Sequence, residues 1–171
     1  EVNSRETGIS YLQPPDLLIN DGAGSFSSAT DAGRPFEKSY VGRGLASADF
    51  DNDGDLDLLL CTIDRGAVLL RNNLNTREKT VSNYLSIRLV GSSGSRDAYG
   101  STVVVEAGGR SQLFLCQAGR SYLCSLDPRI NAGLGDSVRV DKVTITWAGG
   151  KTQVLEDLPV NQQLVVEEPR Q

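Results

Sequence analysis

Nine residues, Asp49-Phe50-Asp51-Asn52-Asp53-Gly54-Asp55-Leu56-Asp57, place a carboxylate at every second position. Counted from Asp49, aspartates stand at loop positions 1, 3, 5 and 9, and a glycine at position 6 permits a sharp turn. The backbone carbonyl at position 7 supplies one further oxygen. Carboxylates this close repel one another unless a hard cation neutralises them. The spacing therefore predicts a Ca²⁺ loop whose metal residues are Asp49, Asp51, Asp53, Asp55 and Asp57.

Two other interpretations of this loop are weaker. A solvated acidic turn rarely places aspartate at four ligand positions and glycine at the bend. An EF-hand needs a bidentate glutamate at position 12, which is Leu60 here, and a helix after it, whereas residues 56–61 are strand-like. A calcium loop between two strands is favoured. Within that interpretation, an ion that only stabilises the turn is favoured over one that also bridges to a partner's carboxylate.

The elements that must position this loop are predicted to be strands. Eighteen glycines, 6% aromatic residues, and short runs of Val, Ile, Leu and Thr without a 3.6-residue period indicate an all-β chain with no helix. We expect a hairpin from residues 17–20 and 25–26. A strand over residues 44–48 should enter the aspartate loop, and a strand over residues 56–63 should leave it.

The first half also contains an internal repeat. Residues 68–73 resemble residues 17–21, about 52 positions earlier, and a unit of that length with one metal loop is typical of a β-propeller blade. One full unit and the end of another cannot close a ring. The chain starts at Glu1 and contains no methionine, so we expect a processed mature chain or a fragment of a longer one.

The second half has a different pattern. Residues 75–82 are polar and are predicted to be a linker, which suggests one domain over residues 1–78 and another over residues 79–171. Seven short strands separated by turn residues predict an antiparallel β-sandwich in the second domain. These expected strands are residues 84–90, 101–106, 111–116, 121–126, 138–147, 151–155 and 163–167.

Three further side chains have alternative roles, and Cys61 has a single expected one. If residues 119–121 form the loop between two strands, Cys116 and Cys124 lie opposite each other and a disulfide is geometrically possible; otherwise both are buried thiols. Cys61 is expected to be a core residue. Trp147, at a strand end, is either a platform for a sugar ring or, as we favour, a ring packed beneath a turn.

Charge and composition exclude several classes of function. The net charge is −5, and residues 1–82 hold 13 acidic and 8 basic side chains against 9 and 9 in the rest. Without a basic stripe we expect no nucleic-acid binding, and without a long apolar run we expect no membrane insertion. The chain has no histidine and no nucleophile-elbow motif, so we expect no catalytic residues and no enzyme.

Two sets of motifs are similar to known families. Residues 42–46 and the aspartate loop resemble the FG-GAP or VCBS repeat, a calcium-binding blade of integrin-like propellers. The second half resembles the ASPIC/UnbV domain. This resemblance implies an extracellular or periplasmic interaction or adhesion protein with no established catalytic activity. The motifs that carry the second resemblance are residues 83–85, 96–100, 119–123, 133–135, 140–147 and 161–164.

Together these patterns predict a partial propeller blade with a calcium loop, followed by a sandwich. The expected function is that of a non-enzymatic, calcium-stabilised module outside the cytoplasm. A truncated repeat should expose strand edges and an apolar face, so a protein partner or self-assembly is expected. The alternative is a carbohydrate-binding sandwich or an accessory domain of a secreted enzyme, and an exposed Trp147 would favour carbohydrate binding.

Overall fold

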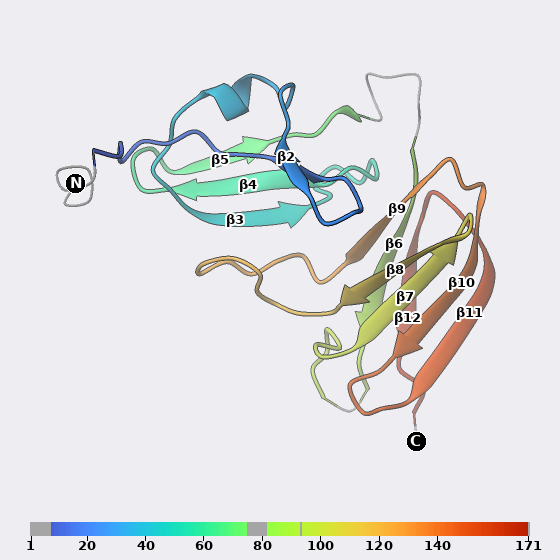
Figure 1. Ribbon diagram of the computed structural model, residues 1–171. Coiled ribbons are helices and arrows are strands. Elements are labelled where there is room, and N and C mark those ends of the chain that lie inside the picture. Colours follow the sequence, from blue (N-terminus) through green and yellow to red (C-terminus); the bar gives the residue numbers. More distant parts are fainter. Residues whose placement is uncertain (1–7, 75–81, 93, 171) are drawn as a thin grey trace. The chain divides into compact units, whose positions relative to one another are not determined.

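The computed structural model describes residues 8–74, 82–92 and 94–170 (Figure 1). These residues are all-β, as predicted, apart from a short 3₁₀ helix, η1, at Arg34–Glu37 and the helical residue Leu74. None of their helical segments has the length and apolar character needed to cross a bilayer. The strands are β1 Leu18–Asn20, β2 Phe26–Ser28, β3 Gly42–Ala48, β4 Asp57–Thr62, β5 Ala67–Leu70, β6 Asn83–Val90, β7 Thr102–Ala107, β8 Arg110–Leu115, β9 Ile130–Gly135, β10 Arg139–Thr146, β11 Thr152–Pro159 and β12 Gln162–Glu167.

The chain divides into two compact units. Unit 1 comprises Glu1–Leu45 and Leu59–Leu70, and unit 2 comprises Ala46–Leu58 and Arg71–Gln171. The chain leaves unit 1 within β3 and returns to it within β4, so the aspartate loop between these strands is part of unit 2. The predicted linker, apart from its last residue, and the predicted boundary between residues 78 and 79 lie outside the described residues and stay predictions.

The predicted N-terminal hairpin is confirmed. Strands β1 and β2 pair in antiparallel fashion, with Ile19 opposite Ser27. The Asp21 carboxylate closes the turn by accepting hydrogen bonds from the backbone N–H groups of Ala23, at 2.7 Å, and Ser25, at 3.1 Å. These bonds lower the pKa of Asp21, the one from Ala23 most.

The strands on both sides of the aspartate loop belong to a three-stranded sheet in the order β3-β4-β5. Unit 1 buries few of its apolar side chains, among them Tyr40, Val41, Leu60 and Leu70. Strands β1 and β5 overlap the two similar segments found in the sequence, so each segment forms a strand in part. That they are repeats of one unit stays a prediction.

Unit 2 contains a seven-stranded sandwich (Figure 1). One sheet has the order β11-β10-β7-β8 and the other β12-β6-β9. The pairing is antiparallel except between β12 and β6, which run parallel. Val160 and Asn161 connect β11 of the first sheet to β12 of the second. Both sheets contribute to one core, which includes Leu85, Ile87, Leu89, Val103, Val105, Ile130, Ala132, Leu134, Val140, Val143, Ile145 and Val166.

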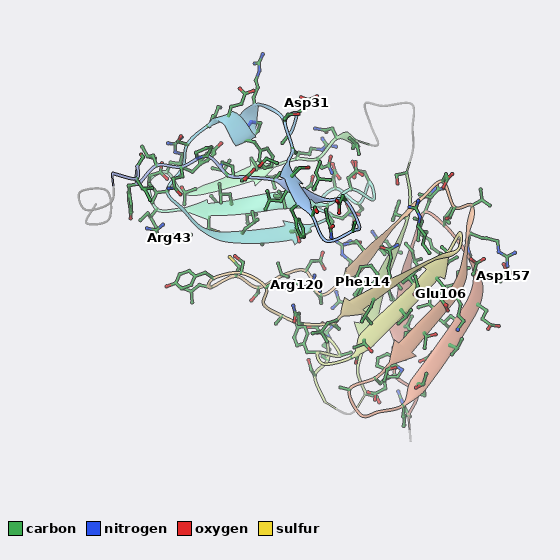
Figure 2. The ribbon with its side chains drawn as sticks, in the orientation of Figure 1. Asp31, Arg43, Glu106, Phe114, Arg120 and Asp157 are labelled. Atoms are coloured by element: carbon green, nitrogen blue, oxygen red, sulfur yellow. The ribbon has the colours of Figure 1, made fainter. Side chains whose placement is uncertain are left out.

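One predicted strand is wrong. Residues 121–126 form a loop with a single isolated bridge between Ser121 and Cys124, and β9 takes the seventh place in the sandwich. Leu123 is 88% exposed and has a left-handed φ of 51°, which a strand does not allow. Arg120, labelled in Figure 2, lies in the same loop. It donates a hydrogen bond to the Leu115 carbonyl at 3.0 Å.

The structure decides between the alternative roles of the cysteines and Trp147. None of the three cysteines is in a disulfide. Cys116 is buried and its thiol donates to the Asp97 carbonyl at 3.1 Å, whereas Cys61, the expected core residue, is only half-buried. Trp147 is 2% exposed and donates from Nε1 to the Gln153 side chain at 3.2 Å, which confirms the packed interpretation.

Candidate metal centre

The aspartate loop joins β3 to β4. Asp49 follows the last residue of β3, and Asp57 is the first residue of β4. The backbone between them turns through two left-handed residues, Asn52 with φ 59° and Gly54 with φ 93°. Asparagine and glycine adopt this region at low cost, so the sequence permits the reversal that brings the two ends of the loop together.

Three of the predicted metal residues converge. Asp49, Asp51 and Asp57 each offer one carboxylate oxygen, and these oxygens lie within 4.8 Å of one another. Asp49 and Asp57 are buried, at 0% and 3% exposed, whereas Asp51 lies at the surface. Two buried acidic side chains beside a third are costly unless their charges are compensated. The arrangement therefore fits a cation, and hard oxygen donors are those that Ca²⁺ prefers.

Asp49 and Asp57 also organise the loop backbone. The Asp49 carboxylate accepts hydrogen bonds from the N–H groups of Asp53 and Gly54, each at 3.1 Å. The Asp57 carboxylate accepts from Phe50 at 3.0 Å and from Asn72 at 2.8 Å. These two residues have a structural role that does not depend on an ion. Asp51 makes an ion pair with Arg71.

The other two predicted metal residues lie outside the converging group. Asp53 turns one oxygen to the N–H of Asp55, at 3.0 Å, while its Oδ2 is buried without a hydrogen-bond partner. Burial raises the pKa of Asp53, and the charges of Asp51, Asp55 and Asp49 raise it further. Asp55 is 8% exposed. The orphaned oxygen of Asp53 is a donor that an ion would satisfy, so its environment also fits a metal.

The comparison with known families agrees with this arrangement. Residues 8–60, which include the whole loop, match the FG-GAP-like repeat family, and residues 91–171 match the ASPIC and UnbV family. The chain carries an FG-GAP-like repeat followed by an ASPIC/UnbV domain. The repeat implies that the strands around the loop form a propeller blade. No curated protein is significantly similar to the chain.

Sequence reasoning missed a residue of the ASPIC/UnbV domain that contacts the loop within unit 2. Arg129 donates from Nη2 to the backbone carbonyl of Asp49, at 2.8 Å, and from Nη1 to the side-chain oxygen of Asn52, at 2.7 Å. The Asp127 carboxylate binds the same guanidinium and raises the pKa of Arg129. Arg129 is 80 positions from Asp49, so no local pattern marks the contact.

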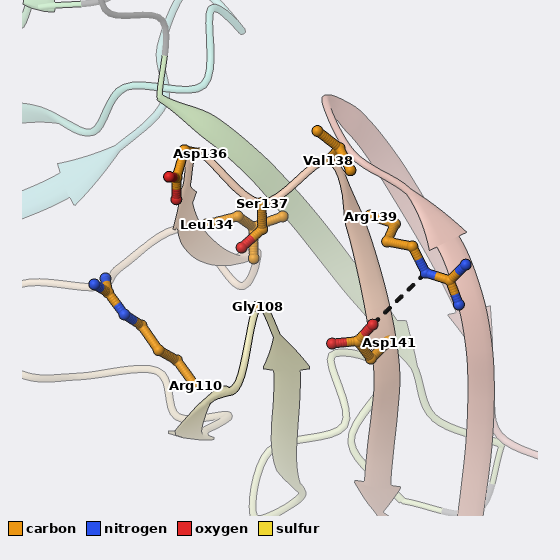
Figure 3. A pocket seen from close by; sticks show the side chains of 8 residues that line it. All are labelled: Gly108, Arg110, Leu134, Asp136, Ser137, Val138, Arg139 and Asp141. Carbon is orange, nitrogen blue, oxygen red and sulfur yellow. Dashed lines mark ion pairs between the residues drawn. The ribbon is translucent and has the colours of Figure 1, made fainter.

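The ASPIC/UnbV domain also has surface hollows, and one of them has a volume of about 330 Å³ (Figure 3). Arg139 and Asp141 on its rim pair with each other at 3.6 Å. Ser137 is the only hydroxyl-bearing residue of the lining, and a chain without histidine provides no imidazole base for it. The lining therefore contains no serine–histidine pair. Its lining residues are Gly108, Arg110, Leu134, Asp136, Ser137, Val138, Arg139 and Asp141.

Proposed function

We propose that the aspartate loop of the FG-GAP-like repeat binds one calcium ion and that the chain is a calcium-stabilised interaction module. The observation that carries this proposal is the convergence of Asp49, Asp51 and Asp57, whose oxygens lie within 4.8 Å of one another. The buried orphan oxygen of Asp53 and the position of the loop inside the family match support it. The backbone carbonyl of Asp55 would supply a further oxygen, as the loop spacing predicts.

We assign the ion a structural role. Two of the three converging carboxylates are buried and hold backbone N–H groups of the loop, so neutralising their charges stabilises the folded turn. A ligand that binds only the folded state, at a hundredfold excess over its dissociation constant, stabilises that state by about 2.7 kcal/mol. The chain has no histidine for acid–base chemistry, and we propose a non-enzymatic function.

Calcium dependence of this kind suits a protein outside the cytoplasm. Extracellular calcium modules bind with dissociation constants of about 10⁻⁴ to 10⁻³ M, and such sites fill only where calcium is abundant. We therefore propose an extracellular or periplasmic location. A dissociation constant in this range, measured by isothermal titration, would support the proposal. One below about 10⁻⁵ M would point instead to a cytosolic sensor or buffer.

The variant that tests the calcium site best is Asp51→Asn. Asp51 pairs with the Arg71 side chain, whereas Asp49 and Asp57 hold backbone N–H groups, so its charge can be removed with least damage to the loop. Wild type should melt at a lower temperature in a chelator than in calcium, and Asp51→Asn should lose most of that difference. Asp141→Asn is the matched control, because Asp141 is also an aspartate paired with an arginine but lies on β10.

The result that contradicts the proposal is simple to observe. If the melting temperature of the wild type is the same in chelator and in calcium, the ion has no structural role. If Asp51→Asn keeps the full calcium dependence of the wild type, Asp51 is not a ligand. A loss of calcium dependence in Asp141→Asn would show that any change in charge is enough, and the assignment to the loop would fall.

The interaction part of the proposal rests on unit 1. Each strand of the β3-β4-β5 sheet exposes a leucine there: Leu45 is 43% exposed, Leu59 39% and Leu69 49%. Exposed apolar side chains on neighbouring strands are typical of an interface. We propose that this sheet meets a partner protein or another copy of the chain. Sedimentation velocity over a range of concentrations tests self-assembly, which Leu59→Lys should weaken, and a monomer at every concentration contradicts it.

The carbohydrate-binding alternative has lost its main support. It required an exposed Trp147 in a polar groove, and the indole is 2% exposed within the sandwich core. A buried ring cannot stack on a sugar. We do not propose this function.

A further inference from the structure

The aspartate loop packs directly on the sandwich within unit 2. A methyl group added at Gly54 would overlap the ring of Tyr84, on β6, so the ring lies against the bare backbone of the loop. Gly54 therefore has two tasks: it adopts a left-handed φ of 93°, and it leaves room for an aromatic side chain of the sandwich. Tyr84 thus lies against the loop at Gly54.

Asn52 makes a second attachment. It stands at loop position 4, which is not a ligand position, and its left-handed φ of 59° points to a specific local conformation. Its side-chain oxygen accepts hydrogen bonds from Arg129 Nη1 at 2.7 Å and from Gln163 Nε2 at 2.8 Å. Gln163 belongs to β12, so the acceptor of one loop residue is shared by two separate segments of the sandwich.

Arg129 is the centre of these contacts. Its guanidinium bonds to Asn52, to the Asp49 carbonyl at 2.8 Å and, through Nε, to Asp127 at 2.8 Å. The side chain is only 19% exposed. A planar guanidinium with several fixed donors holds its acceptors in one geometry, which an ammonium group cannot reproduce. Arg129 thus fixes the backbone of the same residue, Asp49, whose carboxylate belongs to the converging group.

We propose that Arg129 couples the filling of the aspartate loop to the folding of the ASPIC/UnbV sandwich, so that calcium bound at the loop stabilises the sandwich core. This inference rests on the proposed calcium function. Arg129 acts here as a positioning residue, since its contacts are with the Asp49 carbonyl and Asn52 and not with a ligand oxygen of the group. When the loop and the sandwich unfold together, the binding energy of the ion is shared by both. Without the guanidinium, the loop can open or close separately.

The single tryptophan of the chain makes the coupling measurable. Trp147 lies in the sandwich core at 2% exposed, so its fluorescence during urea unfolding of the full chain reports the sandwich and not the loop. Calcium binding is followed separately by isothermal titration. At a hundredfold excess of calcium over its dissociation constant, the unfolding constant seen by Trp147 should fall about 100-fold in the wild type.

Arg129→Gln should still bind calcium in the titration, but calcium should change its Trp147 unfolding constant by less than about 10-fold, against about 100-fold in the wild type. Arg139→Gln is the matched control, because it removes another arginine of the sandwich that pairs with aspartates but lies on β10. This control should keep the full calcium effect. If Arg129→Gln also keeps it, the coupling through Arg129 is wrong.

The outcomes separate this inference from the function on which it rests. A wild type that binds no calcium in the titration refutes the calcium function, and the coupling with it. A wild type that binds calcium without any change in the Trp147 transition refutes the coupling alone. If Arg129→Gln does not fold, Arg129→Lys takes its place, since lysine keeps the charge but cannot bond both Asp49 and Asn52 in the same way. A full calcium effect in that variant overturns the proposal.

Discussion

Replacing Asp53 by asparagine should stabilise the protein when calcium is absent. The carboxylate has one buried oxygen without a partner and three acidic neighbours, so its charge opposes folding. The amide of Asp53→Asn would keep the acceptor for the Asp55 N–H and place a donor near carboxylates instead of a further negative charge. A hydrogen bond to a charged group contributes about 1.5–3 kcal/mol, and after imperfect geometry we expect a gain of about 1–2 kcal/mol in a chelator.

Calcium should reduce this advantage. If calcium binds as proposed, a hundredfold excess should stabilise the wild type by about 2.7 kcal/mol, and a tenfold loss of affinity in Asp53→Asn should leave only about 1.4 kcal/mol. The advantage of the variant should therefore fall by about 1.3 kcal/mol when calcium replaces the chelator. Urea unfolding followed by Trp147 fluorescence measures both conditions, with Asp141→Asn as the control for the change in net charge.

The effect of pH has a definite sign. Burial raises the pKa of Asp53 in the folded protein above its ordinary value of 3.8, so the folded state holds the proton more tightly than the unfolded state does. Asp53 therefore favours folding below pH 3.8, and this contribution is lost as the pH rises through the raised pKa. In chelator, Asp53→Asn should exceed the wild type most at pH 7 and approach it as the pH falls. A variant less stable than the wild type in chelator, or a difference independent of pH, refutes the reasoning.

Two further predictions concern packing. Gly54→Ala should lower the free energy of unfolding by about 1–3 kcal/mol from backbone strain, and by more because the new methyl group overlaps Tyr84. Urea unfolding measures this loss, and a variant as stable as the wild type would contradict the prediction. Cys116 should resist alkylation in the folded protein, because burial raises the pKa of its thiol and the charge of Asp97 raises it further. The half-buried Cys124 should react earlier. Mass spectrometry of partly alkylated protein shows the order in which the two cysteines react.

The aspartate loop shows how much of a site can be predicted from residue spacing alone. Alternating carboxylates and a glycine correctly indicated a turn between strands with converging acids, because both features are local. The spacing did not show that Asp53 would turn toward a neighbouring N–H while Asp49, Asp51 and Asp57 meet. Which carboxylate faces the centre depends on the backbone donors within reach, and these are known only once the loop is folded.

The sandwich shows a different limit. Most of its strands were predicted from apolar runs, but β9 was missed because Gly133 and Gly135 interrupt its pattern. Its buried residues still alternate, at Ile130, Ala132 and Leu134. The false strand over residues 121–126 was chosen for its apolar letters, yet two of them lie exposed in a loop. Alternation of burial, and not apolar content, distinguishes the two segments.

The segments that match the two families do not coincide with the two compact units of the structure, and the difference has a physical reason. The family match of the repeat includes the aspartate loop, but the contacts of that loop with Arg129, Gln163 and Tyr84 place it in the same unit as the sandwich. Tyr84, on β6, lies outside both matched segments. The carboxylates lie in the segment that matches the FG-GAP-like repeat, whereas Arg129 and Gln163 lie in the segment that matches ASPIC and UnbV, so neither matched segment alone holds all of these contacts. We therefore expect the stabilising effect of the proposed calcium ion to depend on both segments.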